Sequence, residues 1–235
     1  MGLISGIVGC ISTAISTAIS TLCSACYSFL KPALNIALKI TGQILKGVTN
    51  LLLDICKAFG VEVGEEDVED GKLGVMIEDT QDTVKPENYN STAEYIRDVK
   101  AKANMQAVNE KMKTLTTEQK EANKLVSVAV LNKIASEELG VEPDLKFYVR
   151  AYEMELDSQE TMKLIEGLKE HGIDNLAAVC SYLDGDLDFE KMEQVDAALK
   201  EGLSKIDPEL TTEEQKENAL SQRLQKMEER MKEEN

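Results

Sequence analysis

Few residues of this 235-residue sequence have the types and spacing that support chemistry, since it contains five cysteines, one histidine and no tryptophan. Cys23 and Cys26 form a CxxC pair, a spacing found in zinc half-sites and in thiol–disulfide centres. A structural zinc site needs four ligands, and the other cysteines and the histidine form no second closely spaced pair. We therefore interpret the two thiols as small apolar side chains on a packed helix face and expect no metal site.

The histidine and one acidic run are the remaining candidates. His171 precedes a glycine, as expected for a cation at a helix C-terminus, and a single histidine is a weak basis for a catalytic triad. Residues 184–188 (DGDLD) are similar to the start of an EF-hand loop, but Phe189 and Val195 replace the glycine and glutamate that calcium binding requires. We interpret this run as helix N-capping residues. The sequence therefore predicts no catalytic residue, no cofactor and no small-molecule substrate, and the expected protein is not an enzyme.

Charge is divided unequally along the chain. Residues 1–60 contain four lysines and one aspartate, a net charge of +3, and the remaining 22 basic and 42 acidic residues give 61–235 a net charge of −20. Nucleic-acid binding requires clustered basic residues that neutralise phosphates, so we expect no nucleic-acid partner. The division indicates a hydrophobic N-terminal part, which binds a membrane or an assembly, joined to an acidic body.

The uncharged segment 3–30 is longer than the roughly 20 residues that span a bilayer as a helix. Its repeat ISTAISTAISTL (residues 11–22) has a period of four, which aligns similar side chains in rows along a helix. One side is apolar and the other is small and hydroxylated, which favours contact between copies of the chain or with a wet lumen. A helix buried in an ordinary globular core is the alternative. The predicted membrane or oligomer contacts here are Ile11, Ile15 and Ile19, then Ser12, Ser16 and Ser20, and finally Thr13, Thr17 and Thr21.

Residues 33–59 are predicted to form an amphipathic helix that follows Pro32 and ends at Gly60. A wide apolar face with a narrow cationic stripe is typical of an interfacial membrane helix. A helix packed under its neighbours in an assembly is the alternative. The predicted apolar contacts are Leu34, Leu38, Leu45, Leu52 and Phe59, and the cationic stripe is Lys31, Lys39, Lys46 and Lys57.

The next segment, 61–90, alternates acidic residues with glycines, which predicts a linker or hinge with at most one short helix or strand, from Leu73 to Ile77. Its predicted hinge residues are Gly60, Gly64, Gly71 and Gly74. Residues 91–207 are predicted to form an acidic helical bundle, because capping boxes begin at Ser91 and Thr116 and the connections between helices are short.

Residues 208–235 are predicted to form a charged C-terminal helix. Leu220, Leu224, Met227 and Met231 have the spacing of a short coiled-coil seam. Either this helix is a solvent-exposed tail or its seam docks on a neighbouring subunit. The predicted fold class is all-α, with two hydrophobic or amphipathic N-terminal helices (1–60), the linker, the acidic bundle and a coiled-coil-like C-terminal helix.

These patterns predict a non-enzymatic, self-assembling, membrane-active protein, either a pore-forming or a membrane-inserting helical oligomer. An order change between Gly60 and Gly74 would release its N-terminal helices. The alternatives are a structural or channel component of a phage or secretion-type assembly, and a membrane-anchored monomeric adaptor. No charged residue precedes Lys31, so we expect synthesis in a bacterial cytoplasm without a cleavable signal peptide. The expected partners are other copies of the chain and a lipid membrane, and the expected location is a membrane or a large assembly.

Overall fold

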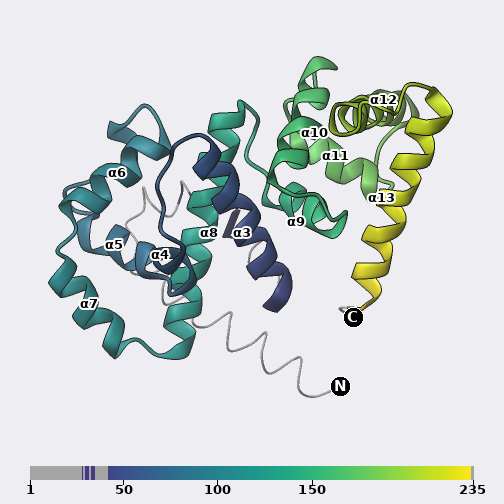
Figure 1. The fold of residues 1–235 in the computed structure, drawn as a ribbon. Coiled ribbons are helices and arrows are strands. Elements are labelled where there is room, and N and C mark those ends of the chain that lie inside the picture. The colour runs from purple at the N-terminus through teal and green to yellow at the C-terminus, as the bar shows by residue number, and fades with distance from the viewer. Residues whose placement is uncertain (1–27, 29, 32, 35–41, 234–235) are drawn as a thin grey trace. The chain divides into compact units, whose positions relative to one another are not determined.

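The computed structural model describes residues 28, 30, 31, 33, 34 and 42–233, and this part of the chain is all-α. Eleven α-helices, α3 to α13, and one 3-10 helix, η1, follow one another in the described residues, with no β-strand among them (Figure 1). Contacts divide the chain into two compact units. Unit 1 comprises the described residues of Met1–Leu45 together with Cys56–Ile134, and unit 2 comprises those of Lys46–Ile55 and Ala135–Asn235.

Helix α3 (Gly42–Ala58) is amphipathic. Its exposed polar residues are Gln43, Lys46, Asn50, Asp54 and Lys57, whose spacings of three, four, four and three place them on one side of the helix. Its buried apolar residues are Leu45, Val48, Leu51, Leu52 and Ile55. Gly60 follows the last turn of the helix and has a φ of +74°. The amides of Gly60 and Val61 donate to the carbonyls of Lys57 and Cys56, which is the Schellman arrangement.

The segment predicted to be a linker is folded in the structure. It contains α4 (Glu65–Glu69), α5 (Lys72–Thr80) and η1 (Pro86–Asn88). The apolar residues of α5 are all buried, namely Leu73, Val75, Met76 and Ile77. The short apolar run therefore forms a core helix of unit 1, because burial of these side chains outweighs the effect of the acidic residues and glycines around them.

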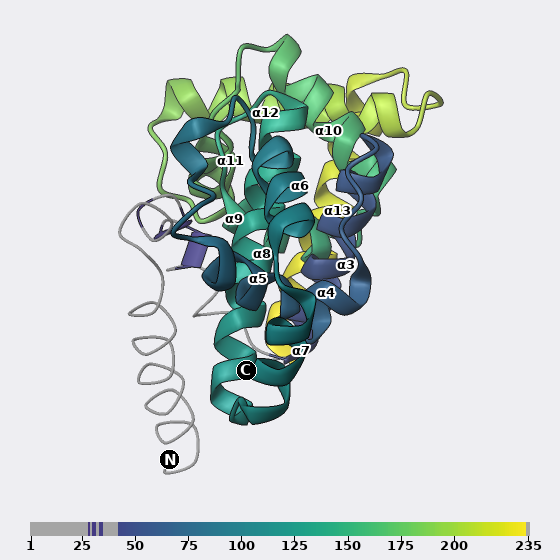
Figure 2. The same ribbon diagram turned by 90° about the vertical axis from the view of Figure 1, so that its left-hand side faces the viewer.

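Two of the predicted hinge glycines permit close helix packing instead. A Cβ atom on Gly71 would lie 2.7 Å from the carbonyl oxygen of Lys120, and one on Gly74 would lie 2.7 Å from that of Asn123. Both oxygens belong to α8 (Thr117–Leu139), which α5 therefore meets backbone to backbone (Figure 2). The structure corrects the hinge prediction at Gly71 and Gly74, because the missing side chains admit a neighbouring helix rather than provide flexibility.

Helices α6 (Thr92–Lys102) and α7 (Met105–Thr114) complete unit 1 with most of α8. The N-caps have the predicted pattern, since Ser91 Oγ accepts from the amide of Glu94. At the start of α8, Thr116 Oγ1 accepts from the amide of Gln119, whose side chain accepts from the amide of Thr116. Residues 125–132 of α8 are all buried. A helix that is covered around its whole circumference lies in the core.

Unit 2 contains α9 (Leu145–Glu153), α10 (Ser158–Glu170), α11 (Leu176–Leu183), α12 (Phe189–Ile206) and α13 (Glu213–Glu233). The first four begin at residues whose side chains accept a backbone N–H, namely Asp144, Asp157, Asn175 and Asp188. Helices α10 and α12 pack against each other (Figure 1). At their contact, a Cβ atom on Gly167 would overlap the Gly202 backbone.

Helix α13 packs on α9 and α12 of the same unit. Leu220 and Met227 of the predicted seam are buried, with exposed fractions of 3% and 6%. Leu224 and Met231 are half-buried. In this conformation α13 packs with its seam against α9 and α12 of its own chain, so it is not a free tail.

Candidate functional site

The residues predicted to contact a membrane or another copy fall into two groups. The Ile, Ser and Thr rows of 11–21 lie outside the described residues, as does Leu38. Leu34, Leu45 and Leu52 are buried, with exposed fractions of 1%, 6% and 0%, whereas Phe59 is 42% exposed. The structure therefore corrects the contact prediction for the three buried leucines. They are core residues in this conformation, and for Leu45 and Leu52 the reason is that the chain itself covers the apolar face of α3.

The predicted cationic stripe lies at the surface where the structure describes it. Lys31, Lys46 and Lys57 are exposed, and Lys39 lies outside the described residues. Positive charge on α3 thus reaches solvent although the apolar face of the helix does not. Among the helices of the described residues, none combines the length and the apolar character that crossing a bilayer requires.

The cysteines and the histidine considered for chemistry form no common site among the described residues. Cys23 and Cys26 lie outside the described residues. Cys180 is buried, and burial raises the pKa of its thiol to about 12, which keeps it in the unreactive protonated form. His171 is the C-cap of α10. Among the described residues, no group of three or more His, Cys, Asp or Glu side chains is arranged to hold a metal ion.

The acidic run 184–188 is divided between two structural roles. Asp188 is the N-cap of α12, and its carboxylate accepts from the amide of Lys191 at 3.0 Å. Asp184 pairs with Lys146 and with Arg150, the latter at 2.9 Å. These ion pairs lower the pKa of Asp184 against the opposing effect of desolvation. The two carboxylates therefore stabilise helix ends and helix contacts.

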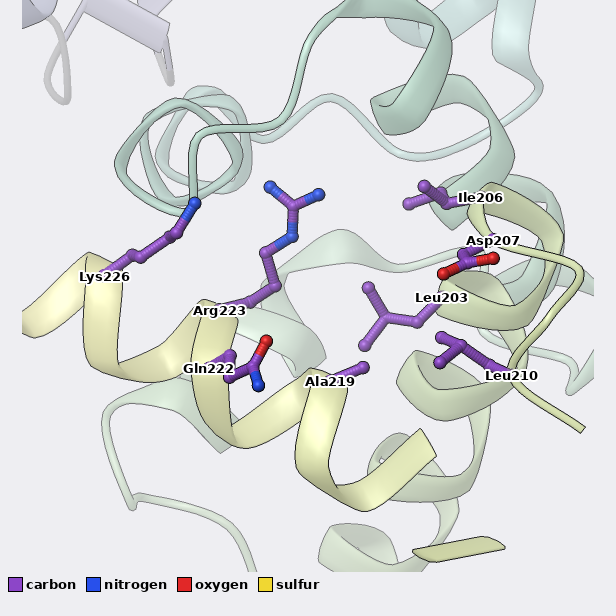
Figure 3. Close-up of a pocket in the computed structure, with 8 residues that line it drawn as sticks. All are labelled: Leu203, Ile206, Asp207, Leu210, Ala219, Gln222, Arg223 and Lys226. Atoms are coloured by element: carbon purple, nitrogen blue, oxygen red, sulfur yellow. The ribbon is translucent and has the colours of Figure 1, made fainter. Parts of the chain in front are cut away.

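A cavity of about 250 Å³ lies between the end of α12 and α13 (Figure 3). Its apolar lining is Leu203, Ile206, Leu210 and Ala219, and its polar lining is Asp207, Gln222, Arg223 and Lys226. The volume is below the roughly 300–1,000 Å³ of most small-molecule sites. Its two cations are already bound to the turn between α9 and α10. We interpret the cavity as a packing gap at the corner between the two helices.

That turn binds the C-terminal half of α13 through a charged group of residues, here called the Glu155 site (Glu155, Glu160, Arg223, Lys226 and Arg230). Glu155 has a φ of +58°, a left-handed conformation that is uncommon for residues other than glycine. Its carboxylate pairs with Lys226 and, at 3.3 Å, with Arg230. The hydrogen bond from Lys226 and the nearby positive charges lower the pKa of Glu155.

The arginines of the Glu155 site also bind backbone carbonyl groups. Arg223 donates to the carbonyl oxygens of Met154 and Glu155 at 3.1 and 3.0 Å, and pairs with Glu160 at 2.8 Å. Arg230 donates to the carbonyl oxygen of Tyr152 at 3.0 Å, and its guanidinium lies 4.8 Å from the centre of the Tyr152 ring. The Tyr152 carbonyl also accepts from the amide of Glu155, and Met154 and Glu155 follow the end of α9, so the two arginines attach α13 to the backbone of this turn.

At the N-terminal half of α13 the signs of the charges are reversed, because the helix carries the carboxylates and its neighbour α12 carries the cation. This group is here called the Lys200 cluster (Lys200, Asp196, Glu213, Glu217 and Tyr182). Lys200 of α12 is 8% exposed. It pairs with Asp196 at 2.7 Å, with Glu213 at 3.3 Å and with Glu217. Tyr182 donates to Asp196 at 2.8 Å. The carboxylates, Asp196 first, raise the pKa of Lys200, so the ammonium stays charged at neutral pH.

The sequence analysis missed both groups. Arg223, Lys226 and Arg230 recur at spacings of three and four, which places them on one face of the helix. That pattern is a signal, but basic residues on a terminal helix are equally expected on a solvent-exposed face. The acidic partners lie far from α13 in the sequence, so only the tertiary structure joins them.

Comparisons of the sequence with protein-family models and with curated proteins, and of the fold with solved structures, gave no match. The fold therefore defines a class, an all-α protein with two helical units.

Proposed function

We propose that this protein is a non-enzymatic, membrane-associated protein that self-assembles through its N-terminal segment while its acidic helical units stay in water. The proposal rests on how apolar residues are distributed. Residues 3–30 carry no charge. In the described part of the chain, the large apolar side chains that are exposed are limited to Phe59, Met105 and Phe189.

Because the apolar face of α3 is buried, we assign lipid contact to a shorter region than the whole of residues 1–60. Because Leu45 and Leu52 are in the interior, we assign α3 the role of connecting the N-terminal segment to the folded units. Lys46 and Lys57 on its exposed side then supply positive charge near an anionic surface. Lipid contact itself is assigned to residues 3–30.

Burial of apolar side chains, rather than charge, must supply most of the binding. A lysine near an anionic membrane surface contributes about 1 kcal/mol, and the net charge of −20 on 61–235 opposes that attraction. Burial of an isoleucine side chain contributes about 1.5–3 kcal/mol. The three isoleucines of the repeat therefore contribute more than the lysines, and binding should persist on uncharged lipid.

Flotation of the full-length chain with uncharged phosphatidylcholine vesicles tests this proposal. Replacing Ile15 and Ile19 together by Asp removes two apolar contacts, and we expect vesicle binding to weaken by at least about 100-fold. The matched control replaces Ser16 and Ser20 by Asp, which adds the same charge on the hydroxylated side. The control should keep vesicle binding and lose cross-linked oligomers, because like charges then meet between copies.

Equal vesicle binding by the unmodified chain and the Ile15→Asp, Ile19→Asp variant would contradict the proposal. Ordered particles in the absence of lipid, together with no vesicle binding, would favour a structural or channel component of a phage or secretion-type assembly. A single copy bound per detergent micelle would favour a monomeric anchored adaptor.

A further inference from the structure

We propose that the surface bound by α13 also accepts α13 from a second copy of this chain, so that two copies exchange the helix reciprocally. The surface comprises Glu155 in the turn between α9 and α10, Glu160 of α10, and Asp196 and Lys200 of α12. Leu220 and Met227 of α13 are buried along the same helix. This interaction is separate from the N-terminal segment and does not depend on contact with a membrane.

The order of charges along the surface specifies its occupant. At one end, Lys200 requires carboxylates, which Glu213 and Glu217 provide. At the other end, Glu155 requires cations, which Lys226 and Arg230 provide. A helix with the reverse order would bring like charges together and be rejected. The helix known to match is α13, and a second copy carries an identical one.

Much of the attachment of α13 is polar and solvent-exposed. The side chains of Glu155 and Lys226 are 41% and 47% exposed, and that of Glu217 is 55% exposed. Individual ion pairs of this kind are weak. Fully buried apolar contact along α13 is limited to Leu220 and Met227. Detachment of α13 therefore removes only two of its own apolar side chains from the interior, and an element with few buried apolar contacts opens more readily than a core helix.

The corner between α12 and α13 contains a packing gap. Residues 207–212 connect the two helices, and the cavity of about 250 Å³ lies directly beside this connection, between Leu203, Leu210 and Ala219 (Figure 3). Pro208 follows Asp207, the C-cap of α12. Because proline has no backbone N–H to donate to the helix, α12 cannot continue through this position. Opening at this corner frees α13 and leaves the crossing of α10 and α12 intact. Exchange of an identical element about such a connection is a low-cost route to a dimer.

Two full-length variants with complementary charge reversals test the exchange. The first carries Lys226→Glu and Arg230→Glu in α13, and the second carries Glu155→Lys on the surface. Within either chain alone, α13 meets like charge. In a mixed dimer formed by exchange, the unmodified α13 of the second variant meets the unmodified Glu155 surface of the first. The reversed α13 of the first variant likewise meets the reversed surface of the second.

Native mass spectrometry of an equimolar mixture gives the readout. We expect mixed dimers in about tenfold excess over the dimers of either variant, because opposite charges are restored only between different chains. A chain that carries all three substitutions is the control and should return to the behaviour of the unmodified protein. Circular dichroism confirms folding, and Lys226→Glu alone replaces the double substitution if the latter unfolds. A statistical distribution of dimers, as association through the N-terminal segment alone would give, overturns the proposal, as does a mixture that stays monomeric.

Discussion

Replacing Gly167 by alanine should destabilise unit 2, because this glycine lies where α10 and α12 cross. A Cβ atom on Gly167 would lie 2.5 Å from the backbone nitrogen of Gly202 and 3.2 Å from the carbonyl carbon of Glu201. These neighbours are backbone atoms, so no side-chain rotation can relieve the overlap. The two helices would have to move apart along their contact, which loosens the packing around it.

The expected loss of folding free energy in Gly167→Ala is the difference between two opposing effects. Overpacking of a well-packed interior costs up to about 3 kcal/mol, and the higher helix propensity of alanine recovers about 1 kcal/mol. The net loss of about 2 kcal/mol should lower the Tm of a chain of this length by roughly 4–8 °C. Thermal unfolding followed by circular dichroism measures the change. Lys163→Ala, at an exposed position of the same helix, is the control and should shift the Tm by less than about 2 °C. An unchanged or raised Tm for Gly167→Ala would refute this account of the crossing.

Three further predictions concern other parts of the fold. Because the pKa of Glu155 is lowered in the folded chain, its ion pairs stabilise the fold above the pKa of the unfolded chain, and that stability is lost as the pH falls through the lower folded value. The Tm difference between the unmodified chain and Glu155→Gln should therefore be largest near pH 7 and disappear in strong acid. Cys180, whose pKa burial raises to about 12, should resist alkylation at pH 8 in the native protein and react after unfolding, as peptide mass spectrometry would show. Gly74→Val should lower the Tm measured by calorimetry by several degrees, since its Cβ atom would meet the Asn123 backbone at 2.7 Å.

Local signals in the sequence were sufficient to predict many helices but not their partners. The cap at Ser91 and the capping box at Thr116 are formed as predicted, because these bonds join residues three apart in the sequence. The acidic, glycine-containing segment 61–90 was predicted to contain at most one short element, whereas it contains α4, α5 and η1. Its flanking charges dominate the local composition, whereas the burial of Leu73 and Ile77 comes with the packing of α5 on elements later in the chain, such as α6 and α7.

The amphipathic pattern of α3 shows the same limit for the candidate site. Periodicity identifies an apolar face, but a face suited to lipid and a face suited to a protein interior have the same composition. The structure places Leu45 and Leu52 in the interior. The Glu155 site was also beyond sequence analysis, because its acids and bases are 63–75 residues apart.

The sequence by itself determined the all-α class, several helix N-caps and the division between an uncharged N-terminal segment and an acidic body. Each of these follows from propensity, capping and composition, which act over a few residues. Only the tertiary structure decided that α5 is a core helix, that the apolar face of α3 is covered and that α13 is bound at both ends by opposite charges. Those outcomes depend on which distant residues meet, and burial, close backbone approach and charge pairing exist only after they have met.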